Sequence, residues 1–385
     1  MRILRRSIHI FLVVCAFALI FNSSGMMALA SFPTPPIVGT ASTAQFDSSS
    51  TVTPLAVGIV GQYGGEAQSV AVAPDGNTAF VGVGRTVAVV DLRAEPVQVG
   101  VSEILPDQIV DLAVKGETIY AVVQREGLWV IGVSDPTHPV VTGYITADRA
   151  SGVTVAGNYL YLAGNDLTIL DISRPLQPVQ VGHLPLSGRP RGLAVAGGYA
   201  YVATGDGLQI VDVSTPMSPI ALGYTGAPGS WSVAATNGYA YVSRVDSGFD
   251  VVDVANPAAP VVVAQVELRA SYDISATSKT VFVVGSHGLS TFDITDPLHP
   301  TPTGLFDTYN ESFGLVVRDN MAYVAARSDG FYVADTSDLT SHKNAGTFRH
   351  AGSGRGHHCS RRLCLCSRRR SRSACAQPGQ PAATH

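Results

Sequence analysis

Residues 192–216 read GLAVAGGYAYVATGDGLQIVDVSTP, and this stretch decides the fold class. It contains three short runs rich in β-branched and aromatic residues, over 192–196, 199–203 and 208–213, separated by Gly and Asp. A similar run, residues 178–182, precedes it. None of these runs is long or periodic enough for a helix, so the sequence predicts four short strands.

This four-strand unit repeats along the chain. The strand that ends at Asp212 recurs six times, and its last position is Asp91, Gly132, Asp171, Asp212, Asp253, Asp293 or Asp335. The steps between these positions are 41, 39, 41, 41, 40 and 42 residues, and a Pro-containing turn usually follows. Four strands in each unit of roughly 40 residues are typical of a propeller blade. A sandwich would lack so regular a period, and a solenoid usually has shorter units. We therefore expect an all-β protein, a single-domain β-propeller over about residues 54–342.

The number of blades depends on how the ring closes. The repeats begin with a run typical of an outermost strand, residues 55–63, and the clear repeats end near Asp335. If the first run completes the last blade, the ring has seven blades of four strands. Residues 344–348 are the alternative outer strand of blade seven. We favour residues 55–63, because that pairing closes the ring and leaves fewer exposed strand edges.

The repeated strings resemble a known family. Residues 208–214 (LQIVDVS) and 249–254 (FDVVDV) are similar to the LVIVD repeat, a propeller repeat of the YVTN and WD40 kind, and the resemblance covers about residues 54–342. It implies an exported β-propeller and supplies no catalytic residues. Gly132 in place of Asp, and the missing Pro after Asp335, are local departures from the repeat.

Composition and charge narrow the class of protein. Hydrophobic residues make up 46% of the 385 residues and charged residues only 14%, with 39 Gly and 23 Pro, which excludes a disordered chain and a helical bundle. Residues 31–342 hold 13 basic and 29 acidic residues, a net charge of −16. An acidic body argues against nucleic acid as a partner, because phosphates require a basic surface.

The first residues have the layout of an export signal. Three arginines precede an apolar run over residues 8–21, and Ala28-Leu29-Ala30 fits a cleavage site, so we expect a signal peptide over 1–30. An uncleaved membrane anchor is the alternative, although the run is shorter than the roughly 20 residues that span a bilayer. Residues 31–53, rich in Ser, Thr and Pro, are predicted to be a spacer. We expect a secreted or cell-surface protein.

The C-terminal segment, 343–385, differs from the rest of the chain. It has nine basic residues, no acidic residue and four of the five cysteines. We expect a disordered basic tail and interpret it as a frameshifted blade, because codons that encode residues 361–370 can encode GGYVYVADGD one base later; restoring it would give eight units. A basic arm for nucleic acid and a zinc site are alternatives. The candidate zinc ligands, whose spacing matches no common pattern, are His357, His358, Cys359, Cys364, Cys366 and Cys375.

The repeat offers little evidence of catalysis. One Asp for each blade, just before a Pro turn, is typical of a carboxylate that caps a turn. His138 and His299 share the motif Asp-Pro-x-His-Pro and are repeat features as well. The chain has no nucleophile elbow, phosphate loop or His-Glu-x-x-His motif. We therefore predict no catalytic residues, no metal site and no cofactor.

The loops that enter the innermost strands suggest a binding surface. In blades three to six these loops are basic or aromatic, which is unexpected in an acidic body and typical of recognition surfaces. The alternative is that each arginine pairs with a nearby acid such as Asp148 or Asp273. The candidate ligand-binding residues are Arg149, Arg189, Arg191, Trp231, Arg269 and Tyr272.

Two classes of function therefore remain. The first, which we favour, is a monomeric binding or scaffold module for an extracellular protein or glycan. The second is a secreted hydrolase or lyase whose site is assembled from loops of several blades. Convergent His, Asp or Glu side chains at the channel mouth would favour the enzyme.

Overall fold

The computed structural model describes residues 43–45, 58–63, 66–308 and 310–337. The predicted signal peptide and the basic tail, with its candidate zinc ligands, lie outside these residues, as does the alternative closing strand at 344–348. Of the predicted spacer, only residues 43–45 are described.

The described residues form strands and turns, with no helix among them, and 28 of the strands make seven four-stranded blades. Blade one has β3 (Ala67–Val72), β4 (Thr78–Val83), β5 (Thr86–Asp91) and β6 (Val97–Val101), and blade two has β7 (Ile109–Lys115), β8 (Thr118–Val123), β9 (Gly127–Gly132) and β10 (Val140–Thr146). Blade three has β11 (Gly152–Ala156), β12 (Tyr159–Ala163), β13 (Asp166–Asp171) and β14 (Val179–Pro185), and blade four has β15 (Gly192–Ala196), β16 (Tyr199–Ala203), β17 (Gly207–Asp212) and β18 (Ile220–Gly226). Blade five has β19 (Ser230–Thr236), β20 (Tyr239–Arg244), β21 (Gly248–Asp253) and β22 (Val261–Glu267), and blade six has β23 (Ser271–Ala276), β24 (Thr280–Gly285), β25 (Gly288–Asp293) and β26 (Thr301–Phe306). Blade seven has β27 (Gly314–Arg318), β28 (Met321–Ala325), β29 (Phe331–Asp335) and, from the other end of the chain, β2 (Gly58–Tyr63).

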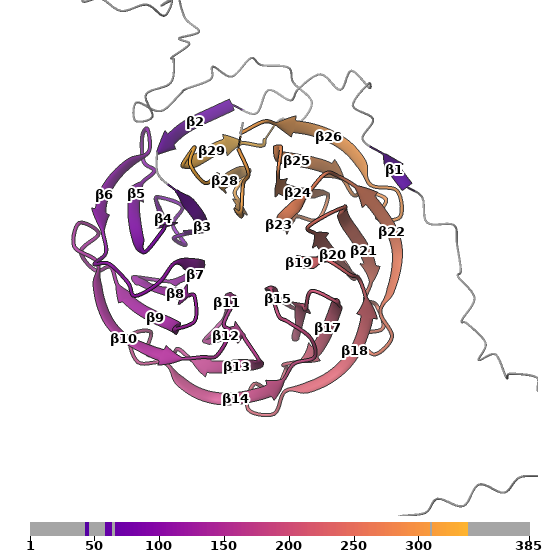
Figure 1. The fold of residues 1–385 in the computed structure, drawn as a ribbon, viewed down its shortest axis with the longest axis horizontal. Helices are drawn as coiled ribbons and strands as arrows, with labels where there is room; N and C mark the ends of the chain where they lie inside the picture. Colours follow the sequence, from indigo (N-terminus) through magenta and orange to yellow (C-terminus); the bar gives the residue numbers. More distant parts are fainter. Residues whose placement is uncertain (1–42, 46–57, 64–65, 309, 338–385) are drawn as a thin grey trace, which may run out of the picture. The chain divides into compact units, whose positions relative to one another are not determined.

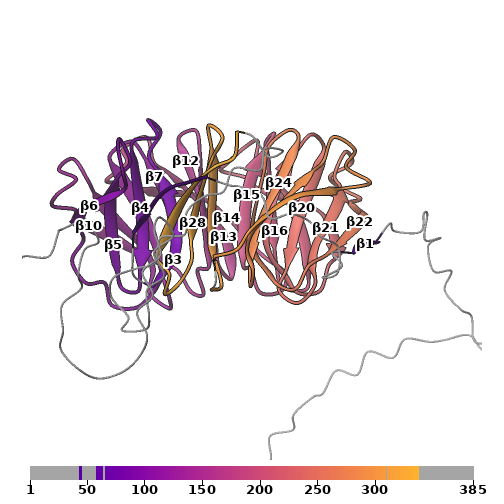
Figure 2. The same cartoon turned by 90° about the horizontal axis from the view of Figure 1, so that it is seen from above.

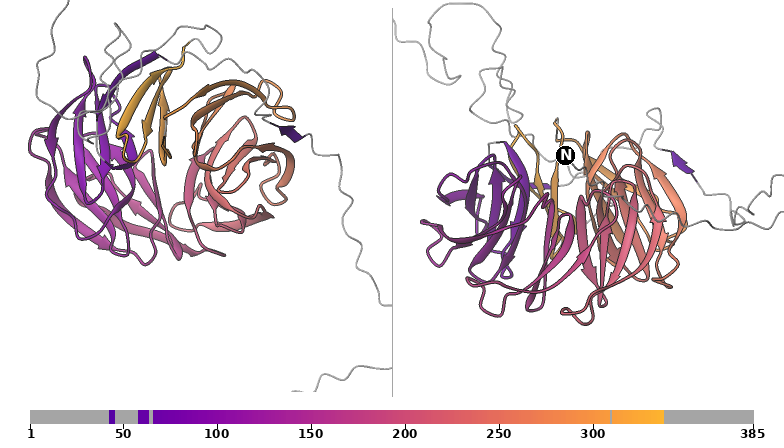
Figure 3. Two further views of the ribbon diagram at one scale, coloured as in Figure 1. Left: turned by 45° about the horizontal axis from the view of Figure 1, so that its top comes forward. Right: turned by 60° about the horizontal axis from the view of Figure 1, so that its bottom comes forward.

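The blades form a ring around a central channel, which confirms the predicted seven-bladed propeller (Figure 1). In blades one to six the first strand of the blade is innermost and the run after the Pro turn is outermost; in blade seven β27 is innermost and β2 is outermost. Each innermost strand contacts the next one around the ring, and β27 of blade seven contacts β3 of blade one. Seen from the edge and at two tilts, the blades stand side by side around the channel axis (Figures 2 and 3).

The ring closes with a strand from the N-terminal side, as predicted. β2 pairs antiparallel with β29, with Gly58 opposite Asp335 and Tyr63 opposite Phe331. The strand begins three residues later than the predicted run. A second link joins blades one and seven, where the backbone N–H groups of Ala67 and Arg327 each donate to the other's carbonyl at 2.9 and 2.8 Å. A further strand, β1 (Thr43–Gln45), pairs parallel with the outer edge of β22.

The hydrophobic core is divided among the blade interfaces. Each of seven clusters of buried side chains joins two neighbouring blades, for example Phe80 of β4 with Ile109 of β7, and Phe331 of β29 with Val70 of β3. The alternation of buried and exposed residues fades in the middle two strands of each blade, because neighbouring blades cover both of their faces. The repeat period therefore sets the spacing of the interfaces as well as the strands.

The repeated aspartates cap turns, as predicted. In each case one carboxylate oxygen accepts the backbone N–H two residues later, at 2.7–3.0 Å. Hydrogen bonds with Arg93 hold the pKa of Asp91 near 2, and those from Ser214 lower the pKa of Asp212. His138 and His299 contact Asp135 and Asp296 within their own turns. These Asp and His side chains therefore have structural roles in the turns of the repeat.

The outer strand that follows the Pro turn contains a glycine where the next blade approaches closely. A Cβ at Gly182 would overlap the carbonyl oxygen of Pro216 in the next blade, whereas a Cβ at Gly143, at the same place in blade two, would have no neighbour within 4 Å. We expect Gly182→Ala to destabilise the protein by roughly 1–3 kcal/mol, because blade four must shift outward. Thermal unfolding of Gly182→Ala and of the control Gly143→Ala measures this, and equal melting temperatures would contradict the tight blade contact.

Candidate binding site at the channel mouth

Several positions of each innermost strand line the channel, and one of these positions is small or acidic in every blade. Near the start of each innermost strand lies a residue that is small or acidic; around the ring these are Ser69, Asp111, Gly152, Gly192, Ser232, Asp273 and Gly314. The blades approach closely here: a Cβ at Gly192 would lie 2.7 Å from the Cα of Ser232, and one at Gly314 2.9 Å from the Cα of Ser69. Side chains at this position therefore point toward the next blade around a cavity of about 460 Å³.

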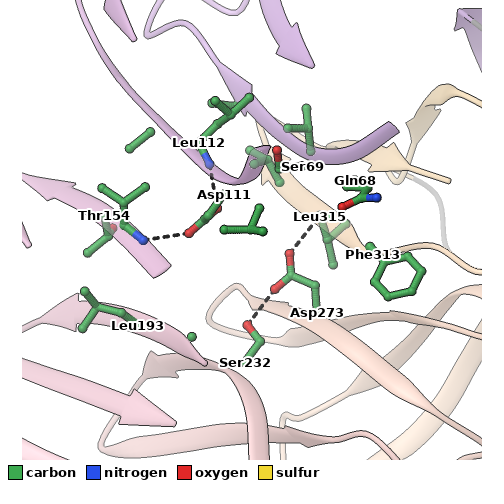
Figure 4. Close-up of a pocket in the computed structure, with 18 of the residues that line it drawn as sticks. Gln68, Ser69, Asp111, Leu112, Thr154, Leu193, Ser232, Asp273, Phe313 and Leu315 are labelled. Carbon is green, nitrogen blue, oxygen red and sulfur yellow. Dashed lines mark hydrogen bonds between the residues drawn. The ribbon is translucent and has the colours of Figure 1, made fainter. Parts of the chain in front are cut away.

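Two of these positions hold carboxylates that join neighbouring blades. Asp111 accepts the backbone N–H of Leu112 at 2.8 Å and, from the next blade, that of Val153 at 2.7 Å. Asp273 accepts the backbone N–H of Leu315 from blade seven at 2.7 Å. Figure 4 shows both side chains in the same cavity, with their hydrogen bonds drawn to the neighbouring strands.

Asp273 also joins blade five to blade six. Its Oδ1 atom accepts the hydroxyl of Ser232 at 2.7 Å and the backbone N–H of Ile274 at 2.9 Å. All four carboxylate oxygens of the two aspartates thus accept hydrogen bonds from the protein.

The enclosed position of these aspartates changes their titration. Burial raises the pKa of Asp111 to about 7 and that of Asp273 to about 6, and the hydrogen bonds they accept limit the rise. The charge of Asp273 adds to the rise at Asp111, which places the two carboxylates within electrostatic reach of each other. No local motif in the sequence marks the two aspartates as a pair. The sequence feature that distinguishes them is that two blades have Asp at this repeat position, whereas the other five have Gly or Ser.

A wider pocket opens above the channel. It has a volume of about 800 Å³ and shares Gln68, Val110, Ser151, Arg191, Trp231 and Phe313 with the channel lining, so the two spaces are continuous. Its wall comes from the loops that enter the innermost strands and from the hairpins between the second and third strands. Four of the predicted binding residues line it: Arg149, Arg189, Arg191 and Trp231.

The other two predicted residues lie elsewhere. Tyr272 lines the channel below the mouth, where its ring stacks on Phe313 with the centroids 4.4 Å apart. Arg269 does not line either space, and its side chain is exposed and contacts Nε2 of His287 at 3.3 Å. The structure therefore brings the residues of blades three to five together and separates Arg269 from them.

An aromatic row of Trp231, Tyr272 and Phe313 runs between the mouth and the channel on the side formed by blades five to seven. The Arg191 guanidinium lies 4.6 Å from the ring centroid of Trp231, and Trp231 meets Tyr272 edge-on at 6.4 Å. At the far end, Arg327 lies 5.0 Å over Phe313 and forms an ion pair with Glu311 at 2.8 Å. The hydroxyl of Tyr272 donates to the same Glu311. The row is thus held in place from both ends.

Three of the four arginines that line the pocket have no acidic partner among the described residues. Among the described residues, Arg149, Arg189 and Arg191 form no ion pair. Asp148, the expected partner in the loop, instead accepts the side-chain amide of Asn165 at 2.6 Å. Arg125 on the same rim does reach an acid, Asp107, at 3.8 Å. Four arginines and one aspartate, Asp148, therefore line one concave space, and Arg149, Arg189 and Arg191 form no ion pair there.

The comparisons with known proteins agree with the repeat. A family model for the LVIVD repeat matches residues 108–146, 147–184, 187–224, 229–267 and 312–349. The chain belongs to the LVIVD-repeat family. The matches correspond to blades two to five and seven, and blades one and six have the same strand order without a match. The last match runs through the alternative closing segment 344–348, although β2 occupies the outer position of that blade.

Solved structures share the fold of this LVIVD-repeat protein at low sequence identity. The protein U3-55K is 10% identical, with a TM-score of 0.60 and coverage of 73% of this chain and 99% of that one. The Pan2 WD40 domain of Neurospora crassa is 14% identical, with a TM-score of 0.57 and coverage of 74% and 97%. BamB from Moraxella catarrhalis is 15% identical, with a TM-score of 0.51 and coverage of 74% and 85%. These likenesses show the propeller fold alone. No curated protein matches the chain.

The described part of the chain has neither a candidate metal site nor a candidate membrane span. Among the described residues, no three His, Cys, Asp or Glu side chains are grouped so that they could hold a metal ion. The same residues contain no helix of the length and hydropathy that a membrane span requires.

Proposed function

We propose that this LVIVD-repeat propeller is a binding module whose ligand occupies the mouth of the central channel. The observation that carries the proposal is the convergence of Arg149, Arg189 and Arg191 on one pocket with no acidic partner among the described residues. Keeping like charges close together costs free energy, so an anionic ligand that neutralises them is the simplest reason for the arrangement. A pocket of this size is within the roughly 300–1,000 Å³ of small-molecule sites.

The proposal includes export, because residues 1–30 have the layout of a signal peptide. A purified protein that begins at Ser31 would support this, and one that retains Arg2 would support the anchor instead.

The binding proposal predicts a specific loss on removing the arginines. We expect Arg189→Ala with Arg191→Ala to weaken the binding of an anionic ligand at least about a hundredfold, because each of the two charge-assisted hydrogen bonds contributes about 1.5–3 kcal/mol. Isothermal titration of the full chain with an acidic trisaccharide, a hexa-aspartate peptide and ATP measures it. Arg174→Ala is the matched control, since Arg174 is an exposed arginine in the turn after β13, at the opposite end of blade three.

The outcomes of this titration are distinct. Binding of at least one probe that the double variant loses and Arg174→Ala keeps supports the channel mouth as the site. Binding that survives the double variant, or no binding of any probe, contradicts it.

A second candidate is an enzyme that uses Asp111 and Asp273. The specific observation in its favour is a pair of carboxylates with raised pKa values in the channel below the mouth, as acid–base catalysis requires. Against it, the hydrogen bonds that both groups accept from neighbouring blades give them a structural role. Cleavage of the acidic trisaccharide by the wild-type chain, lost in Asp111→Asn and in Asp273→Asn while both variants stay folded, would establish the enzyme.

A further inference from the structure

We infer that the ligand of the mouth is a short acidic oligosaccharide, with its carboxylate or sulfate group bound by the arginines and a sugar ring placed against Trp231. The inference rests on the proposed function, which assigns binding to this pocket. It adds the chemical class of the ligand.

The backbone at Arg149 is strained, as it also is at Arg125 and Arg327, where φ is +65° and +42°. Arg149 has a φ of +55°, in the left-handed region that disfavours a long side chain. The turn is closed by a backbone hydrogen bond from the N–H of Ala150 to Ala147. Blade five has the same turn, closed from Ser230 to Ala227, with Gly229 at φ +83° in the third place. Blade three therefore carries an arginine where glycine fits without strain, and such strain is found mainly at functional sites.

The charge distribution limits the length of the ligand. Residues 31–342 have a net charge of −16, whereas the lining of this one pocket has four arginines and a single acid, Asp148. A long polyanion would extend from the pocket over acidic surface and be repelled there. A short ligand with one or a few acidic groups meets only the positive sector.

The neutral part of the pocket indicates a sugar. Trp231 is half-buried and lines the pocket, with the Arg191 guanidinium over one face of its indole; the ring surface that remains exposed can pack against the apolar C–H face of a pyranose. Gln108, Gln124 and Asn165 line the same pocket from blades two and three; the glutamine amides can both donate to and accept from sugar hydroxyls, whereas the Asn165 amide already donates to Asp148. A concave wall of amides, arginines and one tryptophan fits a polyhydroxylated sugar ring better than it fits the broad surface of an acidic partner protein.

The two tryptophans of the chain allow a direct readout. Trp129 lies in β9 and stacks on Tyr144 of β10, outside the pocket, so Trp129→Phe leaves Trp231 as the only tryptophan reporter. We expect trigalacturonate to change the Trp231 fluorescence of this full-chain variant in a saturable way. Maltotriose, a neutral trisaccharide, should bind at least tenfold more weakly. A sulfated disaccharide in parallel distinguishes sulfate from carboxylate as the preferred group.

Two further variants test the contacts. Arg189→Ala with Arg191→Ala should weaken trigalacturonate binding at least about a hundredfold, from the loss of two charge-assisted interactions. Arg149→Gly should weaken it about fivefold or more, while the melting temperature stays the same or rises, because glycine relieves the turn. A lower melting temperature for Arg149→Gly would contradict the argument from strain.

The results separate the inference from the function on which it rests. Equal affinity for trigalacturonate and maltotriose would overturn the acidic ligand. Binding of hexa-aspartate, but of neither acidic sugar, with loss in the arginine double variant, would overturn the saccharide and keep the mouth as the binding site. If no probe depends on Arg189 and Arg191, the proposed function itself is wrong.

Discussion

Deleting residues 58–63 from the full chain should lower the melting temperature by on the order of 10 °C or more. These residues are β2, which forms the outer strand of blade seven by pairing with β29. Without it, β29 becomes an exposed edge, and blades seven and one are held mainly by β27 against β3 and by the Ala67–Arg327 bridge. Each blade packs on two neighbours, so loosening one interface weakens the constraint on the whole ring.

A deletion of equal length provides the control. Removing residues 43–48 eliminates β1, which only adds to the outer edge of blade five. Thermal unfolding by circular dichroism should show a small change for this deletion and a large one for 58–63. Similar melting temperatures for the wild type and the 58–63 deletion would contradict closure by β2 and favour the segment at 344–348.

Stability should fall as the pH rises from about 4 to about 7.5, by several kcal/mol. Asp111 and Asp273 have folded-state pKa values of about 7 and about 6, above the ordinary aspartate value of 3.8. In this range the folded state therefore holds protons that the unfolded state has released. The stabilisation that these two groups contribute is complete below pH 4 and is lost as the pH rises through their folded-state pKa values. Burial shifts the pKa of Asp250 in the same direction.

Substitution of the two aspartates tests this origin. In Asp111→Asn with Asp273→Asn, the decline between pH 5 and 7.5 should be much flatter, although the overall stability is lower because each amide supplies one acceptor oxygen instead of two. Asp91→Asn is the control, since the pKa of Asp91 is near 2 and its titration ends below this range. Urea unfolding at several pH values gives the slopes. An unchanged slope in the double variant would show that the channel aspartates do not titrate in this range.

Most of the fold could be predicted from the repeat. Equivalent strands pack between neighbouring blades in the same way, so similar residues recur at the spacing of the blades. The order of strands, the role of Asp212 and its equivalents, and closure by the first run followed from residue patterns alone. The start of β2 was placed three residues early. This strand lacks a preceding blade that would fix its register.

The site was predictable only in part, because it is assembled from loops that the repeat leaves variable. Arg149, Arg189, Arg191 and Trp231 were found by reading the loops in blade order, and the structure brings them to one pocket. Arg269 occupies an equivalent loop, but its side chain lies outside the pocket and contacts His287. A side-chain direction of this kind depends on tertiary contacts, which one sequence does not contain.

The channel aspartates show a different limit. Asp111 and Asp273 lie more than 160 residues apart in the chain and become neighbours only when the ring closes. Their hydrogen bonds to Val153 and Leu315 cross blade interfaces and have no local sequence signature. Aligning the seven repeats at this position would have shown Asp in two blades and Gly or Ser in five.

The most direct test of the binding account is a crystal structure of the full chain soaked with trigalacturonate. The account predicts electron density for the sugar at the channel mouth, with a carboxylate about 3 Å from the guanidinium of Arg189 or Arg191 and a pyranose ring against Trp231. Density on the outer strands, density between Asp111 and Asp273 alone, or an empty mouth at saturating ligand would contradict it.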